Sequence, residues 1–240
     1  TSIINYVNLI KMEKIENERV QGYVKILDEK SQRLKQLTED LVEASKISSG
    51  NVKLDMQTID LVELVYQTSG EFNEKFEQKE LTIVTKLPKT AVLIRADGRQ
   101  LYRVIENLYN NVAKYALEKT RVYVDISYVE EKVVFSIKNV SEHSLARENS
   151  NAGDLTERFI RGDSSRTTEG SGLGLSIAKS LTVLMGGVFD IKVDGDLFKA
   201  SITFPQYADG NGSDAGTEDP VSEDDYEIEE LEPEERTEEE

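Results

Sequence analysis

Two short runs near the end of the folded part of the chain constrain its fold most, because each alternates apolar and polar side chains around a turn at Asp194-Gly195-Asp196. The apolar members are Phe189, Ile191 and Val193 in the first run, and Phe198, Ala200, Ile202 and Phe204 in the second. An Asp-Gly pair between alternating runs is typical of a tight hairpin, so we expect antiparallel strands with one buried and one wet face. Such a face must be covered by other elements.

Residues 52–205 supply the covering helices in alternation with further strands. Asp60 is expected to cap a helix that ends near Gln78, and Asp97 to cap a long helix that reaches Ala116. A third helix is predicted from Leu173 to Met185, where glycines stop it. The other expected strands are Leu81–Leu87, Val92–Ile94, Val122–Val129 and Val133–Ile137. The expected class is α+β, with an α/β sandwich over residues 50–206.

The first 49 residues predict a helical hairpin ahead of the sandwich. Its first arm is expected from Ser2 to about Lys14 and its second from about Arg19 to Ser48. The second arm repeats every seven residues, with Val20, Leu27, Leu34 and Leu41 in one set and Tyr23, Lys30, Leu37 and Ala44 in its companion. This spacing favours a dimerising four-helix bundle. The alternative is an amphipathic helix that packs on its own domain.

The acidity of the chain is concentrated at its C-terminal end. The net charge is −17, and residues 206–240 hold 16 acidic residues against one arginine, which leaves −2 for the first 205 residues. Nucleic-acid binding needs clustered Lys and Arg, so no nucleic-acid partner is expected. Residues 207–240 are rich in Gly, Ser, Asp and Glu and are predicted to be a disordered acidic tail.

The residue inventory excludes other classes of site. The chain has no cysteine and one histidine, which rules out disulfides and thiolate sites and argues against multi-histidine metal sites and Ser-His-Asp triads. His143 lies in polar loop sequence and is interpreted as solvated rather than as a catalytic base. No apolar run approaches the length of a membrane span. We expect a fragment of something longer, because the chain starts at Thr1 within helix-like sequence.

The long helix that is predicted to end at Ala116 carries a polar stripe beside its apolar face. The stripe holds Arg103, Asn107, Asn111 and Lys114, and Tyr115 lies next to Asn111. Asparagine is a middling-to-poor helix former, so two on one stripe call for an explanation. Amide oxygens and an ammonium group suit a divalent cation and a ligand that bears phosphate. Taken alone, however, the stripe favours an ordinary solvated face.

A glycine-rich run, residues 170–175, opens the last predicted helix. Backbone amides at such a helix start can approach a phosphate, although the run has neither the Lys of a Walker A loop nor the preceding strand of a dinucleotide motif. Just upstream, Phe159 lies among three arginines in residues 157–166. This segment fits a lid over phosphates, and the alternative is an exposed loop anchored by Phe159. At helical spacing, Leu173 and Leu175 are most simply core residues.

Three of these segments together resemble the motifs of bacterial sensor histidine kinases. Residues 106–115 resemble the N box, residues 155–166 the F box and residues 170–175 the second glycine box, in the family's order and near its spacing. The resemblance covers residues 1–205. It implies the Bergerat ATP-binding fold, which gyrase and MutL-type ATPases share, with ATP and Mg²⁺ as ligands.

The same resemblance implies roles for individual residues. Asn107 and Asn111 would contact Mg²⁺, Lys114 the phosphates, and Tyr115 the adenine. The remaining implied ATP-binding residues are Asn139, Arg161, Arg166, Gly170, Ser171, Gly172, Leu173, Gly174 and Leu175. The hairpin would be the dimerisation and phosphotransfer region. Residues 1–6 resemble the segment just after the family's His-containing box. The resemblance therefore implies a phosphoacceptor histidine about seven residues before Thr1 and no catalytic residue within the chain.

One position departs from the family's pattern. The family has Asp-x-Gly-x-Gly after the strand predicted to end at Ile137, whereas this chain reads Asn-Val-Ser-Glu-His over residues 139–143, without glycine. Asn139 falls where the adenine-binding Asp is expected. Its amide oxygen can accept a hydrogen bond from an amino group, but it has no negative charge. The departure favours weaker adenine binding.

The sequence therefore predicts an ATP-dependent protein histidine kinase of a two-component system. The expected partners are a second copy through the hairpin and the receiver domain of a response regulator. The expected location is the cytoplasmic part of a membrane-associated protein, with membrane contact only through parts outside the chain. The alternative is a degenerate nucleotide-binding scaffold or phosphatase partner. A gyrase-type clamp is disfavoured, because the related hydrolases have a water-activating Glu where this chain has Asn107.

Overall fold

The structure is a computed structural model that describes residues 2–13, 17–50, 52–142, 173–207 and 226–231. The chain divides into two units, one holding the residues up to Val52 and the other, from Lys53, holding all of the strands. Within the described ranges, no helix is both long and apolar enough to cross a lipid bilayer.

The first unit is the helical hairpin that the heptad pattern predicts. Helix α1 is Ser2–Met12 and helix α2 is Glu18–Ser48. Asn17 caps α2, because its side-chain oxygen accepts from the backbone amides of Arg19 and Val20. Lys11 of α1 pairs with Asp28 of α2 at 2.6 Å, and this hydrogen bond holds the pKa of Asp28 below its usual value.

The heptad residues of α2 lie largely outside the contact with α1. Val7 and Val24 are buried in the hairpin, whereas Leu27, Leu34 and Leu41 are 52%, 56% and 63% exposed. Regularly spaced leucines on one helix are the pattern that a bundle partner covers. Dimerisation through this stripe stays a prediction.

The second unit is built on a six-stranded mixed sheet in the order β6-β7-β5-β4-β2-β8. Its strands are β2 (Thr82–Pro88), β4 (Arg121–Val129), β5 (Lys132–Val140), β6 (Val188–Asp194), β7 (Leu197–Pro205) and β8 (Tyr226–Leu231). Only β2 and β4 are parallel. The predicted hairpin is confirmed as β6 and β7, joined at Gly195, whose φ of +61° suits glycine.

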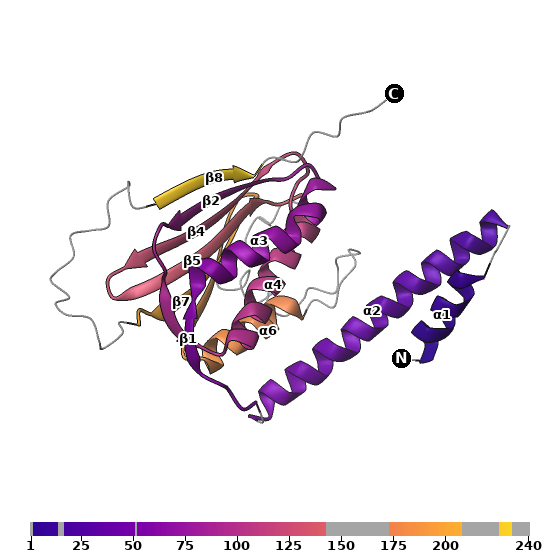
Figure 1. The fold of residues 1–240 in the computed structure, drawn as a ribbon, viewed down its shortest axis with the longest axis horizontal. Coiled ribbons are helices and arrows are strands. Elements are labelled where there is room, and N and C mark those ends of the chain that lie inside the picture. Colours follow the sequence, from indigo (N-terminus) through magenta and orange to yellow (C-terminus); the bar gives the residue numbers. More distant parts are fainter. Residues whose placement is uncertain (1, 14–16, 51, 143–172, 208–225, 232–240) are drawn as a thin grey trace. The chain divides into compact units, whose positions relative to one another are not determined.

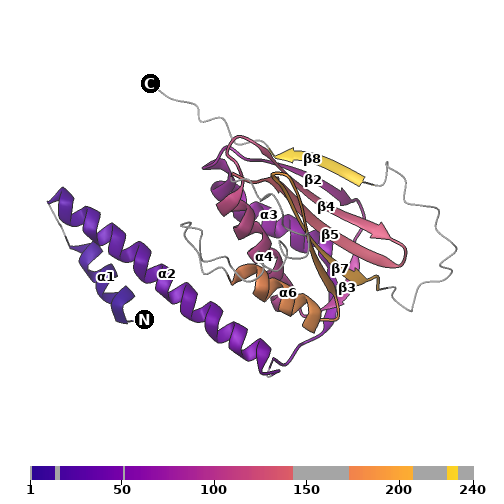
Figure 2. The ribbon, with the colours of Figure 1, turned by 180° about the vertical axis from the view of Figure 1, so that it is seen from behind.

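Three helices cover one face of this sheet, as Figures 1 and 2 show. They are α3 (Leu61–Glu77), α4 (Gly98–Tyr115) and α6 (Gly174–Leu184). Between α3 and α4 the core is aromatic, because Tyr109 stacks on Phe76 at 6.0 Å and lies 5.3 Å from Phe72 between ring centroids. The predicted fold class, a helical hairpin followed by an α/β sandwich, is therefore confirmed.

Two strands, β1 and β8, were not expected from the sequence. Strand β1 (Gln57–Asp60) pairs with β3 (Leu93–Ala96), which was expected, in a separate two-stranded sheet. The prediction that all of residues 207–240 are disordered is corrected for residues 226–231, which form β8 against β2. Backbone pairing at an open sheet edge needs little apolar burial, so an acidic segment can form a strand there. The rest of the predicted tail beyond Tyr207 lies outside the described residues.

The hydroxyl of Tyr109 gives the first prediction, because this fully buried ring makes one polar contact across the helix interface, 2.8 Å from Ser69 Oγ. Burial also raises the pKa of Tyr109. Tyr109→Phe should lower the free energy of unfolding by about 1–2 kcal/mol. In urea unfolding, Tyr109→Phe with Ser69→Ala should cost less than the two single changes added together. Strict additivity would show that the pair is not coupled.

Candidate functional site

Helix α4 presents the polar stripe because its apolar face is fixed against the core. Leu101, Ile105, Leu108 and Val112 are all fully buried. Asp97 fixes the start of the helix from two sides, since Oδ1 accepts from the Gln100 amide at 3.0 Å and Oδ2 from the Asp55 amide at 2.9 Å. Rotation of α4 is therefore set by the core, and its position along the axis by Asp97.

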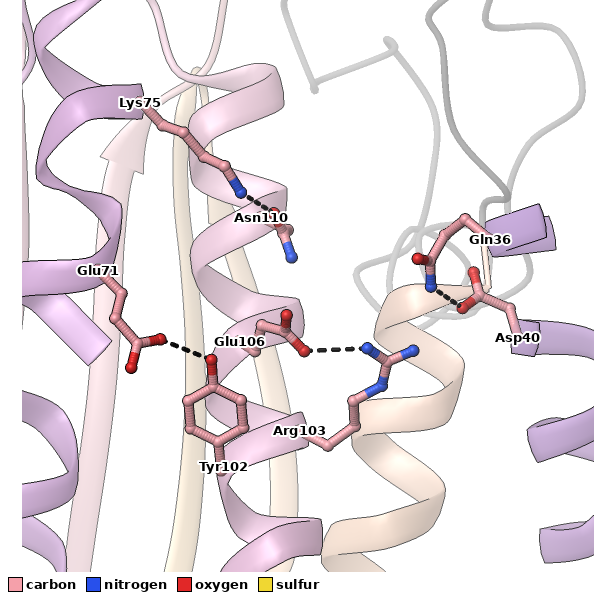
Figure 3. Close-up of polar contacts among 8 residues, drawn as sticks. All are labelled: Gln36, Asp40, Glu71, Lys75, Tyr102, Arg103, Glu106 and Asn110. Atoms are coloured by element: carbon pink, nitrogen blue, oxygen red, sulfur yellow. Dashed lines mark hydrogen bonds and ion pairs between the residues drawn. The ribbon is translucent and has the colours of Figure 1, made fainter. Parts of the chain in front are cut away.

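Polar contacts tie the outer side of α4 to α3, as Figure 3 shows. Tyr102 donates to Glu71 at 2.6 Å and Lys75 donates to Asn110 at 3.2 Å. The first contact raises the pKa of Tyr102 to about 12 and lowers the pKa of Glu71. Because Asn110 takes this bond, the neighbouring asparagines of α4 remain the candidates for a ligand.

The C-terminal end of α4 is held by Lys79 and by the end of β5. Lys79 Nζ donates to the carbonyl oxygens of Lys114 at 3.1 Å and Ala116 at 3.3 Å. Glu142 donates its amide to the Tyr115 carbonyl, and Leu117 donates to the Val140 carbonyl, both at 2.9 Å. These bonds place Tyr115 next to the residues that follow Asn139 on β5.

Asn107 lies at the contact between α4 and α6. A Cβ atom added to Gly174 would come within 3.1 Å of Asn107 Oδ1, so the first residue of α6 packs directly on this amide. Asn107 Nδ2 is buried and finds no acceptor among the described residues. The structure thus brings the predicted asparagine stripe and the end of the glycine run together, and leaves one donor unsatisfied there.

Asn139 lies within the sheet, near the end of β5. It is 2% exposed and pairs with Val122 on β4 and Phe198 on β7. Its Nδ2 donates to the Val140 carbonyl at 3.0 Å, whereas its buried Oδ1 finds no donor within the described part of the chain. Flipping the amide would point its oxygen at that carbonyl, so Oδ1 is the free atom. A buried acceptor without a partner costs stability and points to a ligand that donates.

The remaining predicted residues of α4 are half-buried. Lys114 Nζ lies 4.8 Å from the centroid of the Tyr115 ring, which is within range of a cation–π contact. Arg103 instead pairs with Glu106 at 2.9 Å, as Figure 3 shows. Among the described residues, no three His, Asp or Glu side chains gather to hold a metal ion. Amide oxygens such as that of Asn111 are hard ligands that suit Mg²⁺ together with phosphate oxygens.

Several predicted site residues cannot be placed. Arg161, Arg166, Gly170, Ser171 and Gly172 lie outside the described residues, as does His143. Leu173 precedes α6 and is half-buried, and Leu175 is 5% exposed. The side chain of Leu175 therefore belongs to the core, as the helical spacing of this residue indicates. Only the backbone of Leu175 remains available to a ligand.

Sequence reasoning missed Lys79 as a support of the candidate site. A lysine just after one helix carries no sequence signal that it reaches the end of another helix 35 residues later. Asp97 gave a clear signal as an N-cap, but its second bond, to the Asp55 amide, depends on tertiary structure.

The fold is that of an ATP-binding domain of the Bergerat type. A family model described as histidine kinase-, DNA gyrase B-, and HSP90-like ATPase matches residues 96–217. Because this match covers just over half of the chain, the chain belongs to that family. The match begins just before α4 and includes both unpaired amides.

The curated relatives are sensor histidine kinases. Sensor protein VanSC of Enterococcus gallinarum is 28% identical over 214 residues, which cover 87% of this chain and 57% of the relative. Sensor histidine kinase WalK of Bacillus subtilis is 23% identical over 209 residues, which cover 85% of this chain and 34% of the relative. The chain thus spans about a third to three fifths of the length of these relatives.

Solved structures agree on the fold. Full-length ShkA, crystallised in complex with AMPPNP, has a TM-score of 0.70 at 22% identity, over 86% of this chain and 43% of that one. Histidine kinase AdeS of Acinetobacter baumannii has a TM-score of 0.61 at 16% identity, over 86% of this chain and 95% of that one. Both likenesses include most of this chain and show the fold alone.

Lys79 gives the second prediction. Lys79→Met should lower the free energy of unfolding by about 1 kcal/mol, because the end of α4 loses two bonds from a charged donor. Lys119→Met is the matched control: it removes a surface pair with Glu80, in which both side chains are more than 60% exposed, and should change stability by under about 0.5 kcal/mol. Equal losses in chemical denaturation would contradict a role for Lys79 in holding α4.

Proposed function

We propose that the chain is the ATP-binding part, with part of the dimerisation region, of a two-component sensor histidine kinase. One observation carries the proposal: in the described structure, two side-chain amides each have one buried polar atom without a hydrogen-bond partner, a donor in one and an acceptor in the other. Asn107 has a donor without an acceptor, and Asn139 has an acceptor without a donor. ATP offers the complement of each, because its phosphates accept hydrogen bonds and its adenine amine donates them.

The phosphate end of the nucleotide is assigned to the contact between α4 and the start of α6. Asn107 lies against Gly174 there, and the N-terminus of a helix favours negative charge. Asn111 and Lys114 follow Asn107 on the same stripe, and the lid arginines Arg161 and Arg166 are proposed to complete the set. A bound Mg²⁺, held by the oxygens of Asn107 and Asn111, would neutralise charge on the phosphates.

The base end is assigned to the end of β5. Asn139 Oδ1 would accept from the amino group, and Tyr115 lies beside the residues that follow Asn139, through the Glu142 amide. A base that carries a carbonyl in place of this amine would bring an acceptor against an acceptor. The site should therefore select 6-aminopurines over 6-oxopurines.

The reaction that we propose is transfer of the γ-phosphoryl group to an imidazole nitrogen on the bundle, and from there to a receiver domain. The protein contributes positioning and charge neutralisation to such a reaction. The acceptor histidine is proposed to lie before Thr1. A second copy through the α2 stripe, and a membrane anchor outside this chain, complete the proposal.

Transfer is favoured over hydrolysis because the carboxylate of Glu106, beside the amide stripe, is already engaged in an ion pair. Glu106 adjoins Asn107 in the helix, but its carboxylate is paired with Arg103 at 2.9 Å. A paired carboxylate is a poor base for water. This distinguishes the site from those of the related hydrolases and leaves the phosphoryl group for a partner imidazole.

The third prediction tests the base end by calorimetry with ATP and with inosine triphosphate, which lacks the amine. The chain should bind ATP about tenfold more tightly, which is the size of one unsatisfied buried hydrogen bond. Asn139→Leu should abolish this preference, while removal of Mg²⁺ should weaken binding of both nucleotides. No heat at millimolar nucleotide would remove the kinase proposal and favour the scaffold alternative.

The fourth prediction concerns the acceptor. Incubated with γ-labelled ATP and Mg²⁺, the 240-residue chain should take up no acid-labile, base-stable label, because its one histidine, His143, lies in polar sequence after β5 and not in the helical hairpin. Adding the upstream segment that contains a histidine should restore labelling. Stoichiometric label that disappears in His143→Gln would overturn the role given to the bundle.

A further inference from the structure

The β2 edge of the main sheet is covered by a strand from the acidic end of the chain. Residues 226–231 pair with β2 in antiparallel register, from Pro88 opposite Tyr226 to Ile83 opposite Leu231. The connecting residues 208–225 lie outside the described part, so β8 is tied to the sheet by a tether of 18 residues. Figure 1 shows β8 as the outermost strand, beside β2.

The contacts of β8 come from both sides of the sheet. On the helix side, Tyr66 of α3 lies 3.4 Å from a carboxylate oxygen of Glu227, and burial together with the charges of Glu229 and Glu227 raises the pKa of Tyr66. On the other side, Lys86 Nζ lies 4.8 Å from the centroid of the Tyr226 ring. Strand β8 is therefore held by backbone pairing to the edge of β2 and by one side-chain contact on each side of the sheet.

The edge that β8 covers needs protection. Strand β2, Thr-Ile-Val-Thr-Lys-Leu-Pro, has one charged residue, and Ile83, Thr85 and Leu87 are almost fully buried. An edge strand with a single charge and an apolar buried side still exposes unpaired backbone groups, which are a template for pairing with another chain. Strand β8, in contrast, has Glu227, Glu229 and Glu230 among six residues. Repulsion between such charges opposes the addition of a further strand.

We infer that residues 226–231 are a tethered guard strand that occupies the open edge of β2 and keeps that edge from pairing with another chain. Two side-chain contacts favour this strand over others, because Lys86 lies over the ring of Tyr226 and Tyr66 donates toward a carboxylate oxygen of Glu227. Recognition by addition of a strand uses backbone pairing for affinity and alternate side chains for selectivity. This role is independent of the nucleotide site.

The tether sets the affinity that the guard strand needs. Covalent connection through a segment of 18 residues gives a strand an effective concentration of about 1 mM at its binding edge. To cover the edge about 90% of the time, the strand needs a dissociation constant of about 0.1 mM or tighter for an open edge. A free peptide that competes with the tethered strand should then bind at least about tenfold more weakly.

The test compares the full chain with Ile228→Pro/Glu229→Pro, since proline cannot donate to a sheet ladder. Ser222→Pro, in the tether, is the matched control. Those amides of Ile83–Leu87 that face β8 and not β4 should exchange hydrogen at least about tenfold faster in the double variant, and their exchange should be unchanged in the control. A labelled peptide of residues 224–233 should bind the double variant at about 0.1 mM or tighter, restore protection of β2, and bind the unaltered chain at least about tenfold more weakly.

Two further results would speak for the guard role or against it. Self-association of the double variant that excess peptide reverses would support it, because the uncovered edge would then be pairing with a second copy. Equal exchange of the β2 amides in the unaltered chain and the double variant would overturn it. So would the absence of peptide binding at 1 mM, or equal binding of a scrambled peptide of the same composition. ATP affinity, measured in the same samples, should be unchanged, so failure here is separable from failure of the kinase proposal.

Discussion

The burial of one face of α4 is the constraint on which the rest of the sandwich depends. With Leu101, Ile105, Leu108 and Val112 fully buried, the helix has one rotational setting, and that setting determines where its amide stripe lies. The aromatic group of Phe72, Phe76 and Tyr109 adds a second restraint from α3. The polar stripe is therefore oriented by hydrophobic packing rather than by its own hydrogen bonds, and Asn107 Nδ2 is left without an acceptor in the described part of the chain.

The ends of α4 add a second kind of control. Asp97 holds the first turn through two backbone amides, and Lys79 holds the last carbonyls. Two backbone bonds connect the end of α4 to the end of β5: Leu117 donates to Val140, and Glu142 donates to Tyr115. With Asp97 and Lys79, these bonds fix the separation between Asn107 and Asn139. Two polar atoms that find no partner among the described residues, on different elements, are thus held at a set spacing. For the proposed nucleotide site this would be preorganisation.

The sequence predicted the main elements because their signals are local. Asp60 and Asp97 are N-caps, and the run around Gly195 alternates with period two, so the helices α3 and α4 and the hairpin β6–β7 were found within a few residues. Strand β1 was missed because a four-residue strand that pairs with β3 has no pattern of its own. The guard strand was missed because acidic composition predicts disorder, whereas the open edge that orders it is a tertiary feature. At the site, motif resemblance found Asn107 and Asn139, but the unsatisfied atoms became visible only in the structure.

In the proposed nucleotide site, the amide at residue 139 would keep base recognition independent of pH. A carboxylate in a buried position of this kind can take up a proton as the pH falls, and it then changes from an acceptor into a donor. An amide has no such second state, and the Val140 carbonyl already fixes which of its atoms faces outward. A sensor built on this domain would keep the same base selectivity at lower pH. Any pH dependence of its activity would then come from other groups in the molecule.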